Sequence, residues 1–404
     1  MRKKAVFFLI TFSHALVHIV PASLSPLLPF IREEFRLSYT YVGILTFILS
    51  LCWAFSSIPA GIIADRVNKN KLLLFIFASL GFLSVSIAFM STFSGVVLIL
   101  IFLSLSVGFF HPPAYTYISR VFSSERGKTI GAFETGGSLG VLIAPLVAGL
   151  VGSYFGWRYV YTLWAVPSFA VAFIFYTYRL SLLKEEISAK DGKVNKTSSF
   201  SHTGEKSTAG SSLKIIYLAQ GFFGFISGGS VSFLPLFLTD VHKLSPVVAG
   251  GMLTMFLAGG VVGKIVGGRY SDILGARKVI VLGFFFTFLF LVLASFLKGL
   301  FLIPALILAG ISLFMILPAL FVFTSQVALV DLGLAYGIQI LSGSGFGAFS
   351  RIIAGVVSDF LGIRYVFFLL SFFAFFSALF LQVYLKDAND GREVDFDSRK
   401  ENKR

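Results

Sequence analysis

The chain has 404 residues, of which 56% are apolar and only 13% are charged. An average soluble domain carries about 25% charged residues, so a water-soluble protein of this length would have too few polar side chains to cover its surface. The composition therefore excludes soluble enzymes, disordered scaffolds and small secreted disulfide proteins. The single cysteine, Cys52, has no partner for a disulfide within the chain.

Twelve apolar runs follow one another along the chain, each long enough for a helix that crosses the hydrocarbon layer. In the first half they cover Ala5–Phe30, Tyr39–Ala64, Leu72–Ser91, Gly95–Ser119, Thr129–Val151 and Tyr159–Tyr178. In the second half they cover Ile215–Thr239, Ser245–Gly267, Val279–Leu297, Leu300–Ser325, Leu334–Val357 and Tyr365–Leu385. The runs are continuous, whereas barrel strands alternate between apolar and polar residues. We therefore predict an all-α integral membrane protein with twelve transmembrane helices.

The basic residues indicate how these helices are oriented. If the N-terminus is cytoplasmic, the segments on that side hold 25 of the 33 Lys and Arg residues, the opposite loops hold six, and two lie within spans. This positive-inside bias predicts a multi-pass protein of the cell membrane with both termini cytoplasmic. The net charge of +14 is then a signal of topology, and we expect no nucleic-acid partner.

A polar segment rich in Lys, Ser and Gly separates the two halves and is expected to be a mobile cytoplasmic linker. The predicted domains are an N-terminal six-helix bundle (1–178), the linker (179–214), a C-terminal six-helix bundle (215–385) and a cytoplasmic tail (386–404).

The two halves repeat one pattern at a nearly constant offset. Gly156–Val160 matches Gly362–Val366 at an offset of 206 residues, and Pro113–Ala114 matches Pro318–Ala319 at 205. An offset that is kept from the first span to the last indicates a duplicated six-helix unit. Parallel repeats of this kind are used by transporters that rock around a site at the middle of the membrane.

A glycine, an aspartate and basic residues stand at the same spacing after the second and the eighth spans. These residues are Gly61, Asp65, Arg66 and Lys69 in the first copy, and Gly268, Asp272 and Arg277 in the second. With this paired motif the sequence resembles the major facilitator superfamily, and the resemblance covers essentially the whole chain. It implies two pseudo-symmetric six-helix bundles that open alternately to the two sides of the membrane. Asn68 stands where the family usually has a second glycine.

A narrower resemblance rests on three segments. Gly108–Ala114, Arg126–Gly127 and Glu134–Gly140, together with Ser13-His14, are similar to the fosmidomycin-resistance type of exporter. The position of Glu134 is more often an amide in that group. The resemblance implies export of a small organic compound.

The two motif aspartates are candidates for a gate. A carboxylate that meets a helix N-terminus gains about 0.3 to 2 kcal/mol, so we expect Asp65 and Asp272 to latch the halves together on the cytoplasmic side. Alternatively, both are ordinary charges of topology-setting loops. Glycines recur at every fourth position in several spans, a pattern that fits either gating or static packing.

Ionisable side chains inside the spans are functional candidates, because each costs at least about 2.5 kcal/mol in the bilayer. His14 and His18 lie one turn apart on the first span. The family resemblance implies that the first and fourth helices line the cavity, so that His14, His18 and His111 would face substrate. Lys264 lies near the end of its span, where its ammonium group can reach the interface.

His111 and Glu134 are expected at similar depths on successive antiparallel helices. A carboxyl group beside a histidine would titrate within reach of physiological pH and would thus serve proton coupling; alternatively, Glu134 is a structural group bonded to a hydroxyl or an amide. Arg351 is an anchor for an anionic substrate, a counter-charge for Glu134 or a headgroup contact. Pro112, with Pro113, removes backbone donors and bends the fourth span.

These patterns favour a secondary transporter, coupled to protons and more in keeping with an exporter than an importer. An ATP-driven pump is disfavoured because the chain has no GxxxxGK[ST] loop, and no HExxH motif points to a metalloenzyme. We expect no enzymatic activity, no cofactor and no metal site. The partners would be a small-molecule substrate, protons and the lipid bilayer, with a monomer as the functional unit. An importer or anion exchanger of the same fold, or a membrane sensor without transport, is the alternative.

Overall fold

The computed structural model describes residues 3–121, 126–177, 208–327 and 332–385. These residues form helices and short connections, and no strand occurs among them. Twelve segments in this part of the chain are long and apolar enough to cross a membrane, as the sequence predicts. The protein is therefore an all-α, multi-pass membrane protein.

The chain divides into two compact units, Met1–Phe200 with Lys243–Thr254 and Ser201–His242 with Met255–Arg404. Residues 179–207 of the predicted linker and the tail 386–404 lie outside the described residues. The helix that opens the second half begins at Thr208, before the predicted span start at Ile215.

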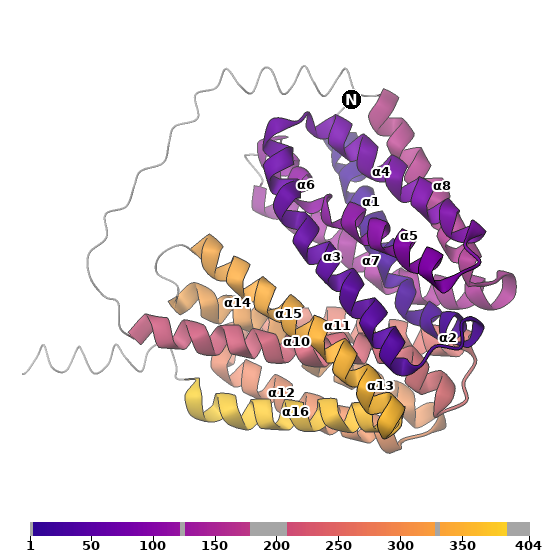
Figure 1. Cartoon of the computed structure of the whole chain (residues 1–404). Helices are drawn as coiled ribbons and strands as arrows, with labels where there is room; N and C mark the ends of the chain where they lie inside the picture. The colour runs from indigo at the N-terminus through magenta and orange to yellow at the C-terminus, as the bar shows by residue number, and fades with distance from the viewer. Residues whose placement is uncertain (1–2, 122–125, 178–207, 328–331, 386–404) are drawn as a thin grey trace, which may run out of the picture. The chain divides into compact units, whose positions relative to one another are not determined.

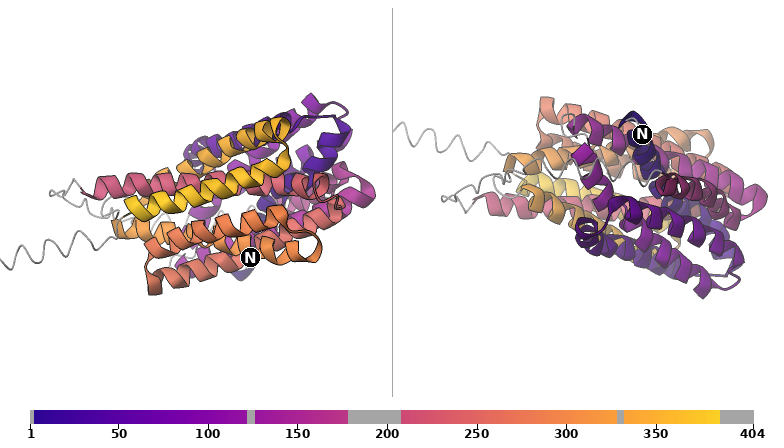
Figure 2. Two further views of the ribbon diagram at one scale, coloured as in Figure 1. Left: turned by 90° about the horizontal axis from the view of Figure 1, so that it is seen from below. Right: turned by 90° about the horizontal axis from the view of Figure 1, so that it is seen from above.

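The first unit contains α1 (Lys3–Ala22), α2 (Leu24–Glu34), α3 (Tyr39–Arg66), α4 (Lys69–Ser86), η1 (Ile87–Phe89), α5 (Phe93–Gly108), α6 (His111–Val121), α7 (Arg126–Phe155) and α8 (Trp157–Thr177). Its helices run side by side as a bundle in all three views (Figures 1 and 2). The main packed pairs are α1 with α7 and α4 with α8.

The second unit contains α10 (Thr208–Asp240), α11 (Pro246–Leu274), α12 (Ala276–Phe296), η3 (Gly299–Phe301), α13 (Leu302–Phe314), α14 (Ile316–Val327), α15 (Leu332–Phe360) and α16 (Ile363–Tyr384). The first turns of α11, up to Thr254, group with the first unit. The main packed pairs are α10 with α15 and α12 with α16. These pairs correspond to those of the first unit, because the sequence repeat aligns α10 with α1, α15 with α7, α12 with α4 and α16 with α8.

Glycines allow the paired helices to approach closely. A Cβ atom at Gly140 on α7 would lie 2.2 Å from the carbonyl oxygen of Ala15 on α1, and one at Gly224 on α10 would lie 2.0 Å from the carbonyl oxygen of Gly343 on α15. A Cβ atom at Gly263 on α11 would lie 2.3 Å from the carbonyl oxygen of Ile311 on α13. These glycines therefore pack helices within each unit.

The fourth span of each unit is broken at the same place. In the first unit α5 ends at Gly108 and α6 begins at His111, so that Pro112 and Pro113 stand in the first turn of α6. In the second unit α13 ends at Phe314 and α14 begins at Ile316. A proline in the first turn of a helix removes an N–H that has no intrahelical partner. The proline pair therefore begins a new helix, with His111 as its first residue.

The two copies of the glycine–aspartate motif are followed by different turns. Asn68 caps α4, since its Oδ1 accepts the backbone N–H groups of Asn70 at 3.0 Å and Lys71 at 3.2 Å. Gly275, which precedes α12, has a φ of +86°, a conformation that glycine adopts without steric cost. The departure from the family pattern at Asn68 thus replaces a glycine turn with a side-chain cap.

Candidate functional site

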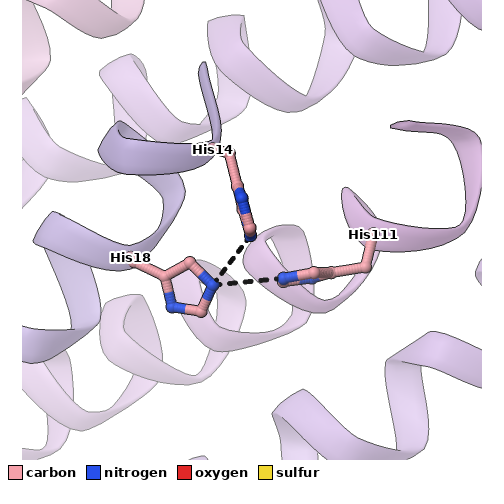
Figure 3. A group of neighbouring side chains, drawn as sticks. All are labelled: His14, His18 and His111. Carbon is pink, nitrogen blue, oxygen red and sulfur yellow. Dashed lines mark hydrogen bonds between the residues drawn. The ribbon is translucent and has the colours of Figure 1, made fainter. Parts of the chain in front are cut away.

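Three histidines from two distant segments meet inside the first unit. His14 and His18 project from the same face of α1 because they lie one turn apart, and His111 comes from the start of α6 (Figure 3). One ring nitrogen from each lies within 4.8 Å of the others. We refer to His14, His18 and His111 as the histidine triad.

The triad is held by close nitrogen contacts. The Nε2 atom of His18 lies 3.1 Å from Nε2 of His14 and 3.3 Å from Nε2 of His111. On its other side, the ring of His14 places Nδ1 2.9 Å from the carbonyl oxygen of Phe133 on α7. A carbonyl oxygen only accepts hydrogen bonds, so Nδ1 of His14 carries the hydrogen of that bond.

Aromatic rings and one glycine fix the position of the triad. The ring of His14, which is only 1% exposed, stacks on Phe133 with ring centroids 3.9 Å apart. Trp53 on α3 meets His111 edge to face at 6.1 Å. A Cβ atom at Gly137 on α7 would lie 2.7 Å from Cε1 of His14 and 2.9 Å from Cδ2 of His18. Only a glycine leaves room for both rings at this position.

Glu134, the neighbour of Phe133, is hydrogen-bonded to a tyrosine. The hydroxyl of Tyr115 on α6 donates a hydrogen bond to Oε1 of Glu134 on α7, and the rings of Tyr115 and His111 lie 6.4 Å apart between centroids. The carboxyl group of Glu134 is exposed on the first unit. The hydroxyl bond of Glu134 is thus the alternative that the sequence left open beside a histidine partner, and Tyr115 contacts both this carboxylate and the ring of His111.

The position of the second unit that is equivalent to His14 holds an amide, whereas those equivalent to His18 and His111 hold Gly224 and Ile316. Gln220 corresponds to His14 at the repeat offset of 206, and its Oε1 accepts Nε2 of Gln339 at 3.1 Å. The Oε1 atom of Gln339 in turn accepts a hydrogen bond from the hydroxyl of Thr324 at 2.7 Å. The network is buried and consists of groups that do not titrate, so within the part of the chain that the structure describes the histidines set the first unit apart.

Arg351 lies on α15 in the second unit, whereas the triad belongs to the first unit. Its Nε donates to the hydroxyl of Ser232 on α10 at 3.0 Å. This contact attaches a cationic side chain to the packed α10–α15 pair. Lys264 on α11 is exposed, with its ammonium nitrogen 5.8 Å from the centroid of the Phe314 ring.

The structure describes only part of the predicted gating motif. In the first copy the side chains of Asp65, Arg66 and Lys69, and the surroundings of Gly61, lie outside the described part. In the second copy Asp272 is exposed near the end of α11, a Cβ atom at Gly268 would meet nothing within 4 Å, and Arg277 donates to the carbonyl oxygen of Gln382 on α16 at 2.8 Å. Arg277 therefore links α12 to α16 within the second unit.

Two residues of the site escaped the sequence analysis. Tyr115 lies four residues after His111, a helical spacing that places both side chains on one face of α6, so this spacing was a usable signal. Gly137 was one of several glycines on its helix. The sequence held no sign that this glycine faces the histidines, because the contact depends on how α7 packs against α1.

Sequence comparison supplies relatives for the whole chain. The family described as Major Facilitator Superfamily matches residues 7–217 and 216–403. The uncharacterized MFS-type transporter YfnC of Bacillus subtilis is 23% identical over 361 residues, which cover 89% of this chain and 87% of that protein. The glycerol-3-phosphate transporter of the same bacterium is 24% identical over 66% of this chain and 64% of its own length.

Solved structures have the same fold. A bacterial homologue of the human lysosomal transporter Spinster, in an inward-facing and occupied conformation, superposes with a TM-score of 0.80 at 18% identity over 95% of this chain and 96% of its own. The peptide transporter POT superposes with a TM-score of 0.77 at 15% identity over 96% of this chain and 94% of its own.

Proposed function

Because this chain belongs to the major facilitator superfamily and is a secondary transporter of small solutes, we propose that it exports a small organic anion across the cell membrane in exchange for protons. The observation that carries this proposal is the histidine triad together with the Tyr115–Glu134 hydrogen bond in the first unit. Ionisable groups in transmembrane helices commonly mark substrate and proton pathways.

The order of the groups along α6 and α7 supports a proton pathway in this scheme. Glu134 would take up a proton from the exposed side of the unit, and the hydroxyl of Tyr115 connects this carboxyl group with the aromatic contacts of His111. In this scheme Glu134 carries the coupled proton, and His14, His18 and His111 sense its presence.

The substrate class rests on the relatives and on Arg351. Proteins similar to this chain include a probable L-galactonate transporter of Escherichia coli, a cis,cis-muconate transport protein of Acinetobacter baylyi and the glycerol-3-phosphate transporter of Bacillus subtilis. All three solutes are organic anions. A guanidinium group fits a carboxylate or a phosphate with two parallel hydrogen bonds, so we assign Arg351 to the anchoring of such an anion.

The resemblance of Gly108–Ala114 and Glu134–Gly140 to fosmidomycin-resistance-type exporters supports the outward direction. We further propose that both termini lie in the cytoplasm, as the positive-inside bias indicates, and that a monomer is the functional unit. The broken helix at Pro112 would let α6 tilt while its first turn keeps its hydrogen bonds. The gate would use Asp65 and Asp272, each at the end of a span.

Transport driven by an imposed pH gradient tests this function. Protein reconstituted in vesicles, with the membrane potential clamped, is offered labelled glycerol 3-phosphate, muconate, galactonate or fosmidomycin. A proton–solute exchanger accumulates solute in vesicles that are acidic inside, whatever the orientation of the protein. Accumulation only in vesicles that are alkaline inside would identify an importer instead, and solute binding without flux would identify a sensor.

A further inference from the structure

The histidine triad has the geometry of a metal site. Around a tetrahedral zinc ion, metal–nitrogen bonds of about 2.0–2.1 Å imply nitrogen–nitrogen separations of about 3.4 Å. The two separations that involve His18 are 3.1 and 3.3 Å, and the three ligand atoms lie within 4.8 Å of one another. The ring planes are inclined to one another at 64°, 83° and 74°, and the three rings approach one another from different sides (Figure 3).

The hydrogen bond of His14 prepares its ring to bind a cation. Since Nδ1 donates to the carbonyl oxygen of Phe133, the neutral ring carries its lone pair on Nε2, which is the atom that faces His18. Metal-binding histidines generally donate their second ring nitrogen to a carbonyl or a carboxylate in this way, which fixes the tautomer and the ring orientation.

The contacts among the three rings also point to a shared cation. An Nε2 atom of a neutral imidazole bears either one hydrogen or one lone pair. The single hydrogen of His18 Nε2 would have to serve both His14 and His111, and without that hydrogen the lone pairs of His18 and His14 would face each other at 3.1 Å. A divalent cation at the centre accepts all three lone pairs at once.

The surroundings keep this arrangement in place. The stacking of His14 on Phe133, the ring of Trp53 against His111 and the missing side chain at Gly137 restrict the three rings to their positions. Ligands that are held by packing lose less freedom when an ion binds.

We propose that the histidine triad binds a divalent transition-metal ion such as Zn²⁺. Three imidazole ligands favour zinc, copper, nickel and cobalt, whereas Mg²⁺ and Ca²⁺ prefer oxygen ligands. Three protein ligands leave a fourth position for water or for a donor atom of another molecule. From the sequence the three histidines were expected to face a substrate and no metal was expected, because the 93 residues between His18 and His111 hide how closely their rings meet. The proposal does not depend on the proposed transport function.

Cobalt spectroscopy on the purified full-length chain tests the site directly. The protein carries an affinity tag without histidines and is titrated with Co²⁺ in detergent, without solute. We expect one Co²⁺ per chain with the strong visible absorption of four- or five-coordinate cobalt, displaced by Zn²⁺ and not by Mg²⁺. Absence of stoichiometric binding, or the weak spectrum of six-coordinate cobalt, would overturn the proposal.

Two sets of variants locate the ion. His18→Ala and His111→Ala each remove one ligand and should weaken Co²⁺ binding at least about tenfold. Size-exclusion chromatography shows whether each variant is folded, and if one misfolds the other still tests the site. The matched control is His202→Ala combined with His242→Ala, which removes the two histidines outside the triad and should bind as tightly as wild type. Unchanged binding in folded His18→Ala and His111→Ala, or its loss in the control, would contradict the assignment.

Discussion

A histidine ring has two nitrogens, and the partner of one decides what the other can do. At His14 the Nδ1–H group donates a hydrogen bond to the carbonyl oxygen of Phe133. The Nε2 atom therefore faces the other two rings as an acceptor. All three histidines could be identified from the sequence by their placement within apolar runs, because charged or titratable groups are rare there. It could not identify the carbonyl partner, since the choice of a backbone group depends on the rotation of α7 against α1.

The glycine that faces the triad should control its geometry. Gly137→Ala would place a methyl group 2.7 Å from His14 and force the rings of His14 and His18 apart. We expect its affinity for Co²⁺ to fall about tenfold or more, although all three ligands remain. The control is Gly337→Ala, an exposed helical position where a Cβ atom meets nothing within 4 Å. Equal Co²⁺ affinities in the two variants would mean that the contact at Gly137 does not control the geometry of the triad.

His242, between α10 and α11, should make stability depend on pH. Burial lowers the pKa of His242 below 6.5, and the charges of Arg364 and Lys298 lower it further. The folded state therefore resists protonation, while the unfolded chain takes up the proton as the pH falls through its own pKa. This contribution to stability is kept above about pH 6.5 and is lost below it.

The corresponding measurement is the midpoint of thermal unfolding in detergent between about pH 7.5 and 5.5, a range that spans the usual pKa of histidine. Wild type should lose stability toward the acidic end, and His242→Gln should lose less. His202→Gln serves as the control because it removes the other histidine outside the triad. A pH dependence that is the same in His242→Gln and wild type would show that His242 is not responsible.

At the scale of single helices, the sequence located the spans well and their interruptions less well. The apolar runs predicted all twelve membrane-spanning segments. The break before His111 was visible as a proline pair, but the sequence favoured a bend, whereas the chain ends one helix at Gly108 and begins another at His111. The break at Met315 in α13–α14 was not predicted, because Pro318 alone does not fix where the preceding helix ends.

Glycines that begin a helix should be sensitive to substitution. Gly362 precedes α16 with φ 101° and ψ 147°, a region that is almost confined to glycine and costs about 1–3 kcal/mol for other residues. Gly362→Ala should therefore lower the unfolding temperature. Gly268→Ala is the control, since this helical position has room for a Cβ atom and alanine favours helix. Unfolding of both variants at the wild-type temperature would show that the positive φ of Gly362 carries no such cost for alanine.

At the scale of the whole molecule, the repeat in the sequence corresponds to a repeat in structure. Equivalent helix pairs pack in each unit, and Gly156 and Gly362, 206 residues apart, have φ values of 98° and 101°. The sequence could predict this duplication because offsets survive when individual residues change. It could not predict that the first unit holds a histidine triad where the second holds a Gln220–Gln339–Thr324 network, since this difference depends on contacts between helices.

The proposed orientation has its own test. Trypsin added to inside-out membrane vesicles should cut in the Lys-rich segment 179–214 and separate the chain into two halves. Sealed vesicles of the opposite orientation should protect this segment. Cleavage there only from the periplasmic or extracellular face would reverse the assignment of both termini.

The proposed exchange depends on proton release by Glu134, and solute accumulation driven by a pH gradient tests this role. Glu134→Gln keeps the size of the side chain and removes its ability to release a proton. We predict that vesicles with this variant, acidic inside, no longer accumulate solute, while they still exchange labelled for unlabelled solute at equal pH. Glu33→Gln, which alters an exposed carboxylate at the end of α2, should behave as wild type. Accumulation by Glu134→Gln at the wild-type level would show that Glu134 does not carry the coupled proton.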